Sequence, residues 1–519
     1  MAKGDGDIIK SLLENRGIKN PKEFLTPPPP QFKLDLTFAY ALIRSKIKKG
    51  KKIVVYGDYD ADGICATAIL WEALKEAGAQ VLPFIPTREK EGYGLSKEGI
   101  DSVEADLIIT VDNGIVAHEA VAYARSKKID IIILDHHEKP NRLPEASAII
   151  HTPELCAAGI AYFVAISLNR SGSKNDPSNW LELAAIATIT DLLPLIGVNR
   201  SIVKYGLELL NETRRVGLRV LFDAAGIEKI GTYEIGYMVG PRLNASGRIE
   251  SALTALRLLC TKNPERAREL AAQLNETNKQ RQKLTEEMTI HAIESQNLKF
   301  KGQKTEERII ILEHESYHQG VIGLVAGKLV EKFYLPSIVI AKSEGESKAS
   351  ARSISGFNII EAIRECDQLL INVGGHPMAA GFSIETGKIE DFKIKIKEFA
   401  REKISDDMLE RTLKIDCELD LAKASIELFE QVSQLAPYGI GNPEPVFAST
   451  GKIQNVRTVG TEGRHLKLVI DGFDAIGFNQ GHLLPKLGVG NLVRIAYNLD
   501  LNTFNGTSKL QLRIKDFII

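Results

Sequence analysis

Three apolar runs that each lead into acidic or histidine side chains constrain the fold of this chain more than any other feature. The runs cover residues 53–55, 105–111 and 130–134, and a segment of helical pattern follows each of the first two. Nearly continuous apolar runs that alternate with helices are typical of a parallel sheet covered on both faces. We therefore predict an α/β domain that binds its ligand beyond the carboxyl ends of these strands.

The polar clusters at the strand ends are candidates for a metal site. In chain order they are Asp58-Tyr59-Asp60-Ala61-Asp62, Asp112-Asn113-Gly114 and Asp135-His136-His137, and Asp191 follows an apolar helix predicted over 181–190. Alternate side chains of an extended segment point to the same side, so the carboxylates of the first cluster repel one another unless a cation lies between them. A solvated acidic turn that caps the next helix explains the first cluster alone. It does not explain three clusters at one sheet edge.

The types of ligand in these clusters indicate which ion they bind. The five cysteines lie outside the clusters, which argues against a structural zinc site: Cys65, Cys156, Cys260, Cys366 and Cys417. Carboxylate together with histidine suits manganese or magnesium, and the number of ligands suggests two ions. Two ions bridged by a carboxylate are the standard apparatus for the attack of water on a phosphorus centre. The sequence thus predicts hydrolysis of a phosphate ester.

Taken together, the four motifs resemble those of the DHH phosphoesterase superfamily. The resemblance implies that two divalent ions, Mn²⁺ or Mg²⁺, are bound and that Asp112 bridges them. The other metal ligands would be Asp60, Asp62, His136 and Asp191, while Asp58 would lie at the rim of the site or act as a further ligand. His137 would orient the substrate phosphate. The candidate catalytic residues are therefore Asp58, Asp60, Asp62, Asp112, His136, His137 and Asp191.

Residues 241–248 are the next candidates for binding phosphate. They are predicted to form a polar loop in which Arg242, Asn244 and Arg248 surround a phosphate, because two arginines can fork its oxygens. An exposed turn without function is an equal alternative. A helix predicted from about residue 264 to 297 would span about 50 Å, so we expect it to bridge two domains.

A second α/β unit is predicted to follow that helix and to carry further polar candidates. These are Ser350 and Arg352 and a loop with Gly374, Gly375 and His376. A Gly-Gly-His loop allows the backbone to approach an anion closely while the imidazole donates to it. A plain turn with a buried histidine is the alternative. Because it follows the four acidic motifs, this second unit resembles the DHH-associated domain. The resemblance implies that these residues bind substrate.

Short alternating strands are predicted from residue 452 onward. They cover 452–459, 465–470, 474–478, 492–502 and 510–517, and Asn505-Gly506 is a strong signal for a two-residue hairpin. Five short strands fit a small barrel such as an OB-fold, a common binder of single strands. A capping β-domain with scattered charges is the alternative.

The order of these parts resembles the RecJ single-strand-specific exonucleases over nearly the whole chain. We expect an N-terminal helical segment (1–50), a DHH domain (51–262), a connecting helix (263–300), a DHH-associated domain (301–405) and an OB-fold domain (406–519). The resemblance implies metal-dependent 5′→3′ degradation of single-stranded DNA to 5′-mononucleotides in DNA repair and recombination. It also implies a single-strand-binding protein and a helicase as partners. Many bacterial members carry a further C-terminal domain, and this sequence ends after the expected barrel.

Two other functions fit the same motifs. One is a DHH phosphoesterase of short oligonucleotides or small phosphate compounds, and the other is a non-catalytic strand-binding scaffold. Lys and Arg (66) nearly cancel Asp and Glu (67), so any polyanion must be held by local patches. The cysteines show no CxxC pairing, which suits a reducing compartment. No apolar run approaches membrane-spanning length and the start lacks a signal peptide, so we expect a cytoplasmic protein that binds no membrane.

Overall fold

The structure is a computed structural model that describes residues 5–87, 90–92, 94–169, 178–295, 307–504 and 506–518. The chain forms two compact units. Unit 1 comprises Met1–Gly240, Leu256–Ala267 and Lys414–Ile519, and unit 2 comprises Pro241–Ala255 and Arg268–Leu413. In the described part of the chain, no helix combines the length and the apolar character needed to cross a bilayer.

A five-stranded parallel sheet forms the centre of the first α/β domain, which belongs to unit 1. Its order is β2-β1-β3-β4-β5, with all neighbours parallel. The strands are β1 (Lys52–Tyr56), β2 (Gln80–Phe84), β3 (Leu107–Val111), β4 (Asp130–Asp135) and β5 (Ala148–His151). The three predicted strands are therefore confirmed as neighbours. The edge strands β2 and β5 are additional, and β2 tolerates Pro83 because an edge strand has one unpaired side.

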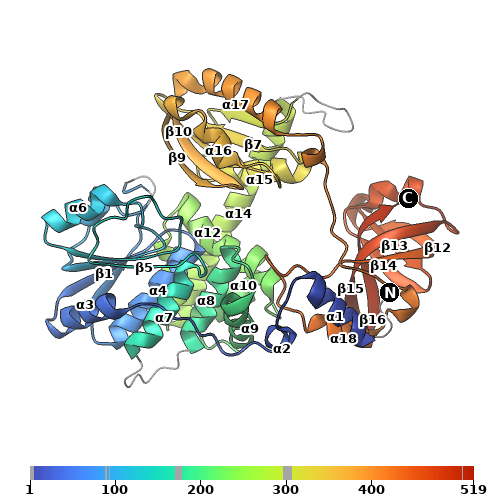
Figure 1. The fold of residues 1–519 in the computed structure, drawn as a ribbon, viewed down its shortest axis with the longest axis horizontal. Helices are drawn as coiled ribbons and strands as arrows, with labels where there is room; N and C mark the ends of the chain where they lie inside the picture. Colours follow the sequence, from blue (N-terminus) through green and yellow to red (C-terminus); the bar gives the residue numbers. More distant parts are fainter. Residues whose placement is uncertain are drawn as a thin grey trace. The chain divides into compact units, whose positions relative to one another are not determined.

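Helices cover both faces of this sheet, as the continuous burial of β3 and β4 requires (Figure 1). Residues Val54, Ile108 and Ile133 pack on one face against α5 (Lys97–Asp101) and α6 (His118–Ser126). The opposite face is covered by α4 (Ala61–Glu76) and α7 (Ala157–Asn169). The remaining helices of this part are α2 (Pro21–Leu25), α3 (Thr37–Lys48), α8 (Ser178–Thr190), α9 (Gly197–Asn211), α10 (Val216–Ala225), α11 (Thr232–Glu234) and α13 (Leu253–Cys260). A π-helix, η1 (Ile235–Val239), continues α11.

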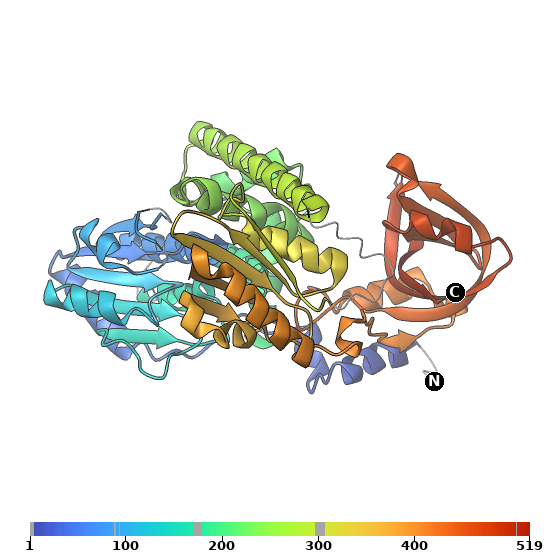
Figure 2. The same cartoon turned by 90° about the horizontal axis from the view of Figure 1, so that it is seen from above.

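The C-terminal strands form a closed barrel that also belongs to unit 1 (Figures 1 and 2). They are β12 (Phe447–Val459), β13 (His465–Ile470), β14 (Phe473–Gly477), β15 (Leu492–Phe504) and β16 (Thr507–Ile518), with a short β11 (Cys417–Glu418) beside β12. Pairing of β12 with β15 closes the ring, and β14 pairs parallel to β16. Phe504 lies opposite Thr507 and Gly506 has φ 76°, as a two-residue turn requires; Asn505 lies outside the described residues.

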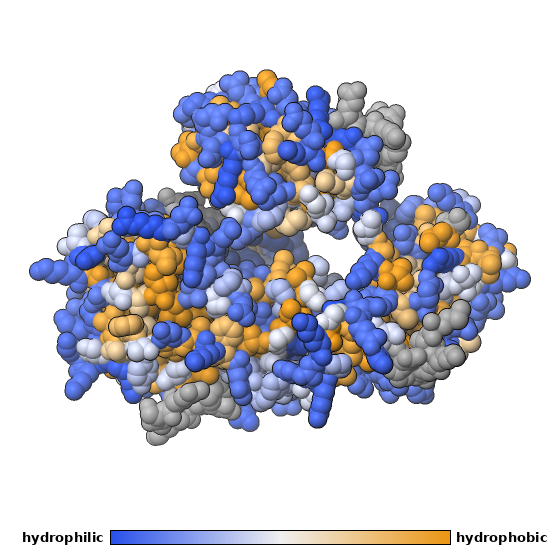
Figure 3. All heavy atoms as spheres, in the orientation of Figure 1, coloured by the Kyte–Doolittle hydropathy of each residue, from blue (hydrophilic) through white to orange (hydrophobic). Residues whose placement is uncertain are grey.

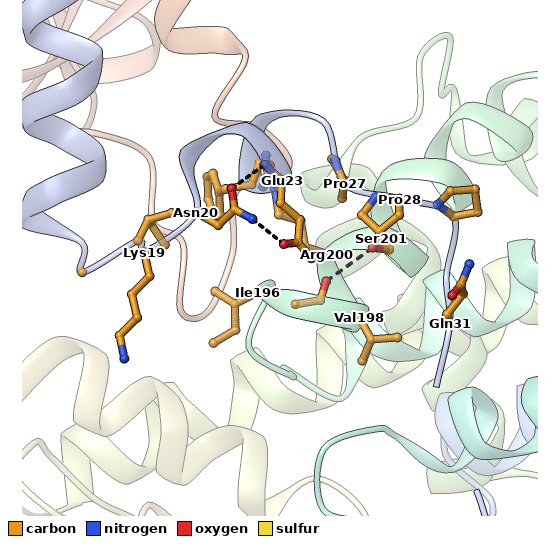
Figure 4. A pocket seen from close by; sticks show the side chains of 15 residues that line it. Lys19, Asn20, Glu23, Pro27, Pro28, Gln31, Ile196, Val198, Arg200 and Ser201 are labelled. Carbon is orange, nitrogen blue, oxygen red and sulfur yellow. Dashed lines mark hydrogen bonds between the residues drawn. The ribbon is translucent and has the colours of Figure 1, made fainter. Parts of the chain in front are cut away.

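The N-terminal helix α1 (Asp5–Asn15) packs into the core of this barrel rather than forming a segment of its own. Ile8 and Leu12 are buried against residues of β12, β15 and α18 (Ile426–Ser433). Arg200 of α9 joins the same region, because its guanidinium donates to the carbonyl oxygens of Phe24 and Ala436 at 2.7 Å each. Figure 4 shows this junction, where a cavity of about 290 Å³ lies between residues 17–31 and the start of α9.

Unit 2 is built on a mixed five-stranded sheet of order β6-β7-β8-β10-β9. Its strands are β6 (Ile310–His314), β7 (Ser337–Ala341), β8 (Glu346–Arg352), β9 (Leu370–His376) and β10 (Ala379–Glu385). One face packs against α15 (Ile322–Phe333), and the other against α16 (Ile359–Arg364) and α17 (Ile389–Lys403). The α/β prediction for this region is therefore confirmed.

Two local predictions for unit 2 are wrong. Residues predicted as a Gly-Gly-His loop lie in β9, where Gly375 pairs with Ala380. The predicted polar loop 241–248 is helical and lies in α12 (Gly240–Ile249). The segment continues directly from the π-helix η1, whose wide turn comes just before the proline, and Leu243 and Ser246 are buried, so packing overrides the weak helix propensity of the segment.

The predicted long helix is confirmed as α14 (Pro264–Ser295), which has 32 residues and a length of about 48 Å. It contributes to both units, because its residues up to Ala267 belong to unit 1 and those from Arg268 onward belong to unit 2. Residues 296–300, which the prediction also assigned to the connecting segment, lie outside the described residues.

Candidate metal centre

Neighbouring strands bring the predicted acidic clusters to one edge of the parallel sheet. Asp58 follows β1, Asp112 follows β3, and Asp135 is the last residue of β4. Because β1, β3 and β4 are adjacent and parallel, their carboxyl ends meet at the same edge. Asp191 reaches this edge from the end of α8.

The first cluster combines a helix cap with buried carboxylates. Asp60 is the N-cap of α4 and accepts from the amides of Asp62 and Gly63 at 3.0 Å each. The capping interpretation is thus correct for Asp60, but it does not describe its neighbours. Asp62 is buried and accepts from the amides of Ala157 and Ala158 at 2.7 Å each, at the start of α7.

Two backbone features allow the clusters to converge. A Cβ at Gly63 would lie 2.7 Å from the backbone nitrogen and oxygen of Asp58, so glycine is needed for the turn to close. Asp112 has φ 66°, in the left-handed region that is costly for most side chains. Strain of this kind concentrates at functional sites, where the surrounding structure enforces it.

His136 lies at the centre of the carboxylates. Its Nε2 is 3.2 Å from Asp112 Oδ1 and 3.7 Å from both Asp62 Oδ2 and Asp191 Oδ2. Three overlapping groups of ligand atoms result, each within 4.8 Å: Asp62, His136 and Asp191; Asp58, Asp60 and Asp112; and Asp112, His136 and His137. Asp112 and His136 each belong to two groups. The groups of Asp62 and of Asp58 have no residue in common, and the third group links them through His136 and Asp112, so the arrangement has ligands for more than one ion.

The electrostatics of this cluster fit divalent cations. Burial, followed by the charges of neighbouring carboxylates, raises the pKa of Asp62, Asp112 and Asp191 above the ordinary value of an aspartate. Ionising several buried carboxyl groups side by side costs free energy, and a bound cation offsets that cost. Carboxylate oxygens with one or two imidazoles are the donors that manganese and magnesium accept.

His137 is held by two neighbours that do not belong to the predicted ligand set. Its Nδ1–H donates to Asp135 Oδ1 at 2.8 Å, and its carbonyl oxygen accepts from Nε2 of His151 at 2.7 Å. Burial lowers the pKa of His137, but the hydrogen bond and charge of Asp135 outweigh it and raise the pKa to about 9. The imidazole is therefore a cation at neutral pH when no metal is bound.

All seven predicted catalytic residues lie together in this centre. The sequence argument gave no role to Asp135 or His151. Asp135 stands inside the third motif, and its place as the last residue of a buried strand was the available signal. His151 ends β5, a strand of four residues that is too short to stand out in the sequence.

The predicted substrate-binding residues other than His137 lie in unit 2. Arg352, Ala379 and His376 form one row across β8, β10 and β9, and Ser350, Gly381 and Gly374 form the next row but one. Opposite residues of antiparallel strands project to the same side, so the arginine, the serine and the histidine share a face. Arg352 Nη1 donates to Ser350 Oγ at 3.1 Å, and burial lowers the pKa of Arg352.

The residues of α12 make contacts within unit 2. Arg242 Nε donates to Asn275 Oδ1 of α14 at 2.6 Å, and Arg248 Nη1 donates to the Gly320 carbonyl oxygen at 3.2 Å. Asn244 lies on the same helix. Burial lowers the pKa of Arg281 on α14, and the nearby charge of Arg242 lowers it further. Arg242 and Arg281 therefore form a cationic cluster between α12 and α14.

Family models match three parts of the chain. Residues 52–188 match the N-terminal domain of the DHH family, residues 306–402 match the DHHA1 domain, and residues 415–516 match the RecJ OB domain. The single-stranded-DNA-specific exonuclease RecJ of Thermus thermophilus is 35% identical over 95% of this chain and 72% of its own length. The chain belongs to the RecJ family.

Further comparisons support this family relationship. RecJ of Bacillus subtilis is 37% identical over 91% of this chain, which spans 62% of the length of that relative. The crystal structure of T. thermophilus RecJ in complex with Mn²⁺ covers 99% of this chain, which spans 76% of that structure, with a TM-score of 0.87 and 32% identity. The same protein is also known in complex with Mg²⁺. The predictions of the DHH and RecJ resemblance and of an OB-like barrel are therefore confirmed. The predicted acidic and histidine residues form groups that could hold a metal ion, and manganese and magnesium are the ions bound by the T. thermophilus protein.

Proposed function

We propose that this chain is a metal-dependent exonuclease that degrades single-stranded DNA in the 5′→3′ direction and releases 5′-mononucleotides. The observation that carries the proposal is the convergence of seven carboxylate and histidine side chains into overlapping ligand groups on a RecJ-family fold. A strand-binding scaffold would have no use for so many buried carboxylates, because they repel both one another and the phosphates of the strand.

The residues of the centre have distinct tasks in this proposal. Asp58, Asp60, Asp62, Asp112, His136 and Asp191 would hold two divalent ions, with Asp112 shared. When bound, such ions supply Lewis-acid activation of water and neutralise the charge that develops on the phosphate. The amides of Ala157 and Ala158 fix the Asp62 carboxylate, so its free lone pairs keep one orientation. This support from α7 would hold the ligand in place throughout turnover.

His137 would orient the phosphate that is attacked. Asp135 accepts a hydrogen bond from Nδ1–H of His137, so the ring orientation is fixed and Nε2–H is left to donate to a phosphate oxygen. The amide of Ile115 holds Oδ2 of Asp135 at 2.9 Å, and the amides of His136 and His137 hold Oδ1. These hydrogen bonds hold the Asp135 carboxylate in one orientation, and the carboxylate in turn holds the His137 ring.

In unit 2, Arg352, Ser350 and His376 would bind phosphates of the strand, together with the glycines of β9 and the residues Arg242, Asn244 and Arg248 of α12. Arg352 offers a planar set of donors beside a hydroxyl, which suits an oxygen-rich anion. Gly374 and Gly381 lie in the same row on the face of His376 and leave the surface beside it without bulky side chains, so a backbone phosphate can approach it. Gly375 faces the other side of the sheet, where a Cβ would collide with the backbone of Ala379 and Ala380.

The barrel would hold the strand away from the catalytic centre. Arg457 of β12 and Lys467 of β13 are cross-strand partners, so their charges lie on one face of the barrel. Single-strand binding by such folds combines basic and aromatic side chains. Since the substrate is exposed only after duplex DNA has been opened, we include a helicase and a single-strand-binding protein among the proposed partners, in the cytoplasm.

The test uses a 5′-phosphorylated single strand labelled at its 3′ end, incubated with the protein and Mn²⁺. A blunt duplex and the Asp112→Ala variant serve as controls. The proposal predicts that the labelled strand shortens step by step, that the duplex persists and that the variant is inactive. Release of the labelled 3′ nucleotide first would contradict the proposed direction. Hydrolysis of dinucleotides alone would replace the proposal with a small-substrate phosphoesterase.

A further inference from the structure

Two exposed tyrosines stack on each other along the helical segment that packs against the end of α8, the helix that leads into Asp191. Tyr233 of α11 and Tyr237 of η1 are 63% and 72% exposed, and their rings lie 4.9 Å apart at an interplanar angle of 28°. Hydrophobic residues reach the surface at several places on unit 1 (Figure 3), so exposure alone does not mark a site. This pair differs because stacking fixes the two rings in one orientation and leaves their outer faces open to solvent.

The tyrosines are held next to the turn that carries Asp191. A Cβ at Gly240 would lie 2.4 Å from Thr190 Cγ2, and one at Gly236 would lie 3.9 Å from Ile189 Cγ2. The π-helix therefore packs directly against the last turn of α8, and Asp191 is the next residue after that turn. Tyr237 follows Gly236 by one residue, so it lies on the flank of the same helix.

The local backbone also fixes the surroundings of the pair. The amide of Gly240 bonds to the carbonyl of Ile235, five residues earlier, in the wide turn of a π-helix; such turns are frequent at functional sites. Glu234, which stands between the two tyrosines, turns its carboxylate back to the Gly231 amide at 2.9 Å. Its charge is thereby engaged in capping the helix rather than directed at the aromatic faces.

The chemistry of this surface suits the bases of a single strand. A strand whose phosphate lies at Asp191 must place neighbouring bases within a few ångströms of that residue. An uncharged aromatic face binds a base by stacking and accepts all four bases equally. The bases of a duplex are already stacked and paired, so their faces are not available. Phosphates would gain nothing from the two rings, which offer hydroxyls only at their tips.

We propose that Tyr233 and Tyr237 form a stacking platform for unpaired bases next to the catalytic centre and contribute to single-strand preference. The inference rests on the proposed nuclease function and specifies how that site recognises its substrate. Both tyrosines bind through their ring faces, so phenylalanine replaces them without loss. Alanine at both positions removes the platform.

The test separates bases from backbone. Binding is measured in EDTA, which prevents cleavage, to a 5′-phosphorylated oligothymidylate and to an abasic strand of the same length. We expect Tyr233→Ala with Tyr237→Ala to weaken binding to oligothymidylate by roughly tenfold or more, the effect of losing a stacked base. Binding to the abasic strand should change less than about twofold, since backbone contacts are kept. The double phenylalanine variant should bind both strands like the wild type.

Phe38→Ala is the matched control, because Phe38 is an aromatic side chain that is 78% exposed near the start of α3, a helix to which the proposal gives no role. It should bind both strands normally. Equal losses of the alanine variant on both strands, or no loss on either, would overturn the platform. A wild-type protein that neither binds nor degrades the oligothymidylate would instead contradict the proposed function itself.

Discussion

Replacing Asp135 by asparagine tests how the centre positions His137. The carboxylate of Asp135 accepts four hydrogen bonds: from the amides of His136, His137 and Ile115 and from Nδ1 of His137. Asparagine keeps the shape of the side chain but has one oxygen fewer and no charge. If the amide oxygen takes the place of Oδ1, its NH₂ group faces the Ile115 amide, and one hydrogen bond is lost.

The loss of charge has a defined consequence for His137. Asp135 is the chief reason that the pKa of His137 rises from 6.5 to about 9. That difference corresponds to about 3.4 kcal/mol in the native state. The His137 side chain is 33% exposed, and solvent screening reduces the contribution to about 1–2 kcal/mol. Because the folded pKa is the higher one, this stability is fully present below pH 6.5 and is lost as the pH rises through 9.

Hydrogen–deuterium exchange at the imidazole carbon, followed by mass spectrometry, reports the titration of single histidines. In metal-free protein we expect His137 to titrate near pH 9, and in Asp135→Asn to titrate close to the ordinary histidine range. With Mn²⁺, activity on single strands should fall about 10–100-fold, as for other residues that orient a catalytic group. An unchanged titration of His137 would refute the assignment of Asp135 as its anchor.

Three further substitutions test separate parts of the structure. His151→Phe removes the donor to the His137 carbonyl and should lower kcat about tenfold with little change in KM, and His151→Gln, which keeps a donor, should recover most of it; equal rates in the two variants would argue against this role. Arg200→Met leaves the carbonyl oxygens of Phe24 and Ala436 without this donor and should lower the free energy of unfolding by about 2–5 kcal/mol, which is measured as a lower thermal midpoint. Lys19→Met changes an exposed residue at the rim of the same cavity and should leave the midpoint unchanged. Arg352→Lys should raise KM for a 5′-phosphorylated strand about tenfold, because lysine lacks the planar fork, and an unchanged KM would exclude this arginine from phosphate binding.

The metal centre could be predicted because its signal is local in the sequence. Strands β1, β3 and β4 are apolar runs, and the candidate ligands follow them, so the rule for parallel sheets was sufficient to bring these residues together. Asp191, which follows an apolar helix, could be included because three acidic clusters already converged on one sheet edge; alone it would have been taken for a helix-terminus residue. The positions of the arginines of α12 and of Arg352 within unit 2 could not be predicted, because they depend on packing between segments that are far apart in the sequence.

Three features escaped prediction for identifiable physical reasons. Strand β2 contains Pro83 and is largely solvent-accessible, so it lacks the buried β pattern. The segment of α12 is rich in residues with low helix propensity, and its helix depends on the burial of Leu243 and Ser246. The helix α1 has an ordinary amphipathic pattern, which indicates a buried face but not what covers that face. The face packs against a barrel about 400 residues later in the chain, and Asn15 Nδ2 donates to the Asp416 carbonyl oxygen at 2.9 Å.

The two-ion centre is the central claim, and electron paramagnetic resonance of bound Mn²⁺ tests it most directly. Titration of the metal-free protein should give two ions per chain, with spectra of an exchange-coupled pair, because Asp112 and His136 belong to overlapping ligand groups. Asp112→Ala should abolish the coupling and leave at most one tightly bound ion. A single uncoupled Mn²⁺ in the wild type, or a coupled pair that survives Asp112→Ala, would contradict the account.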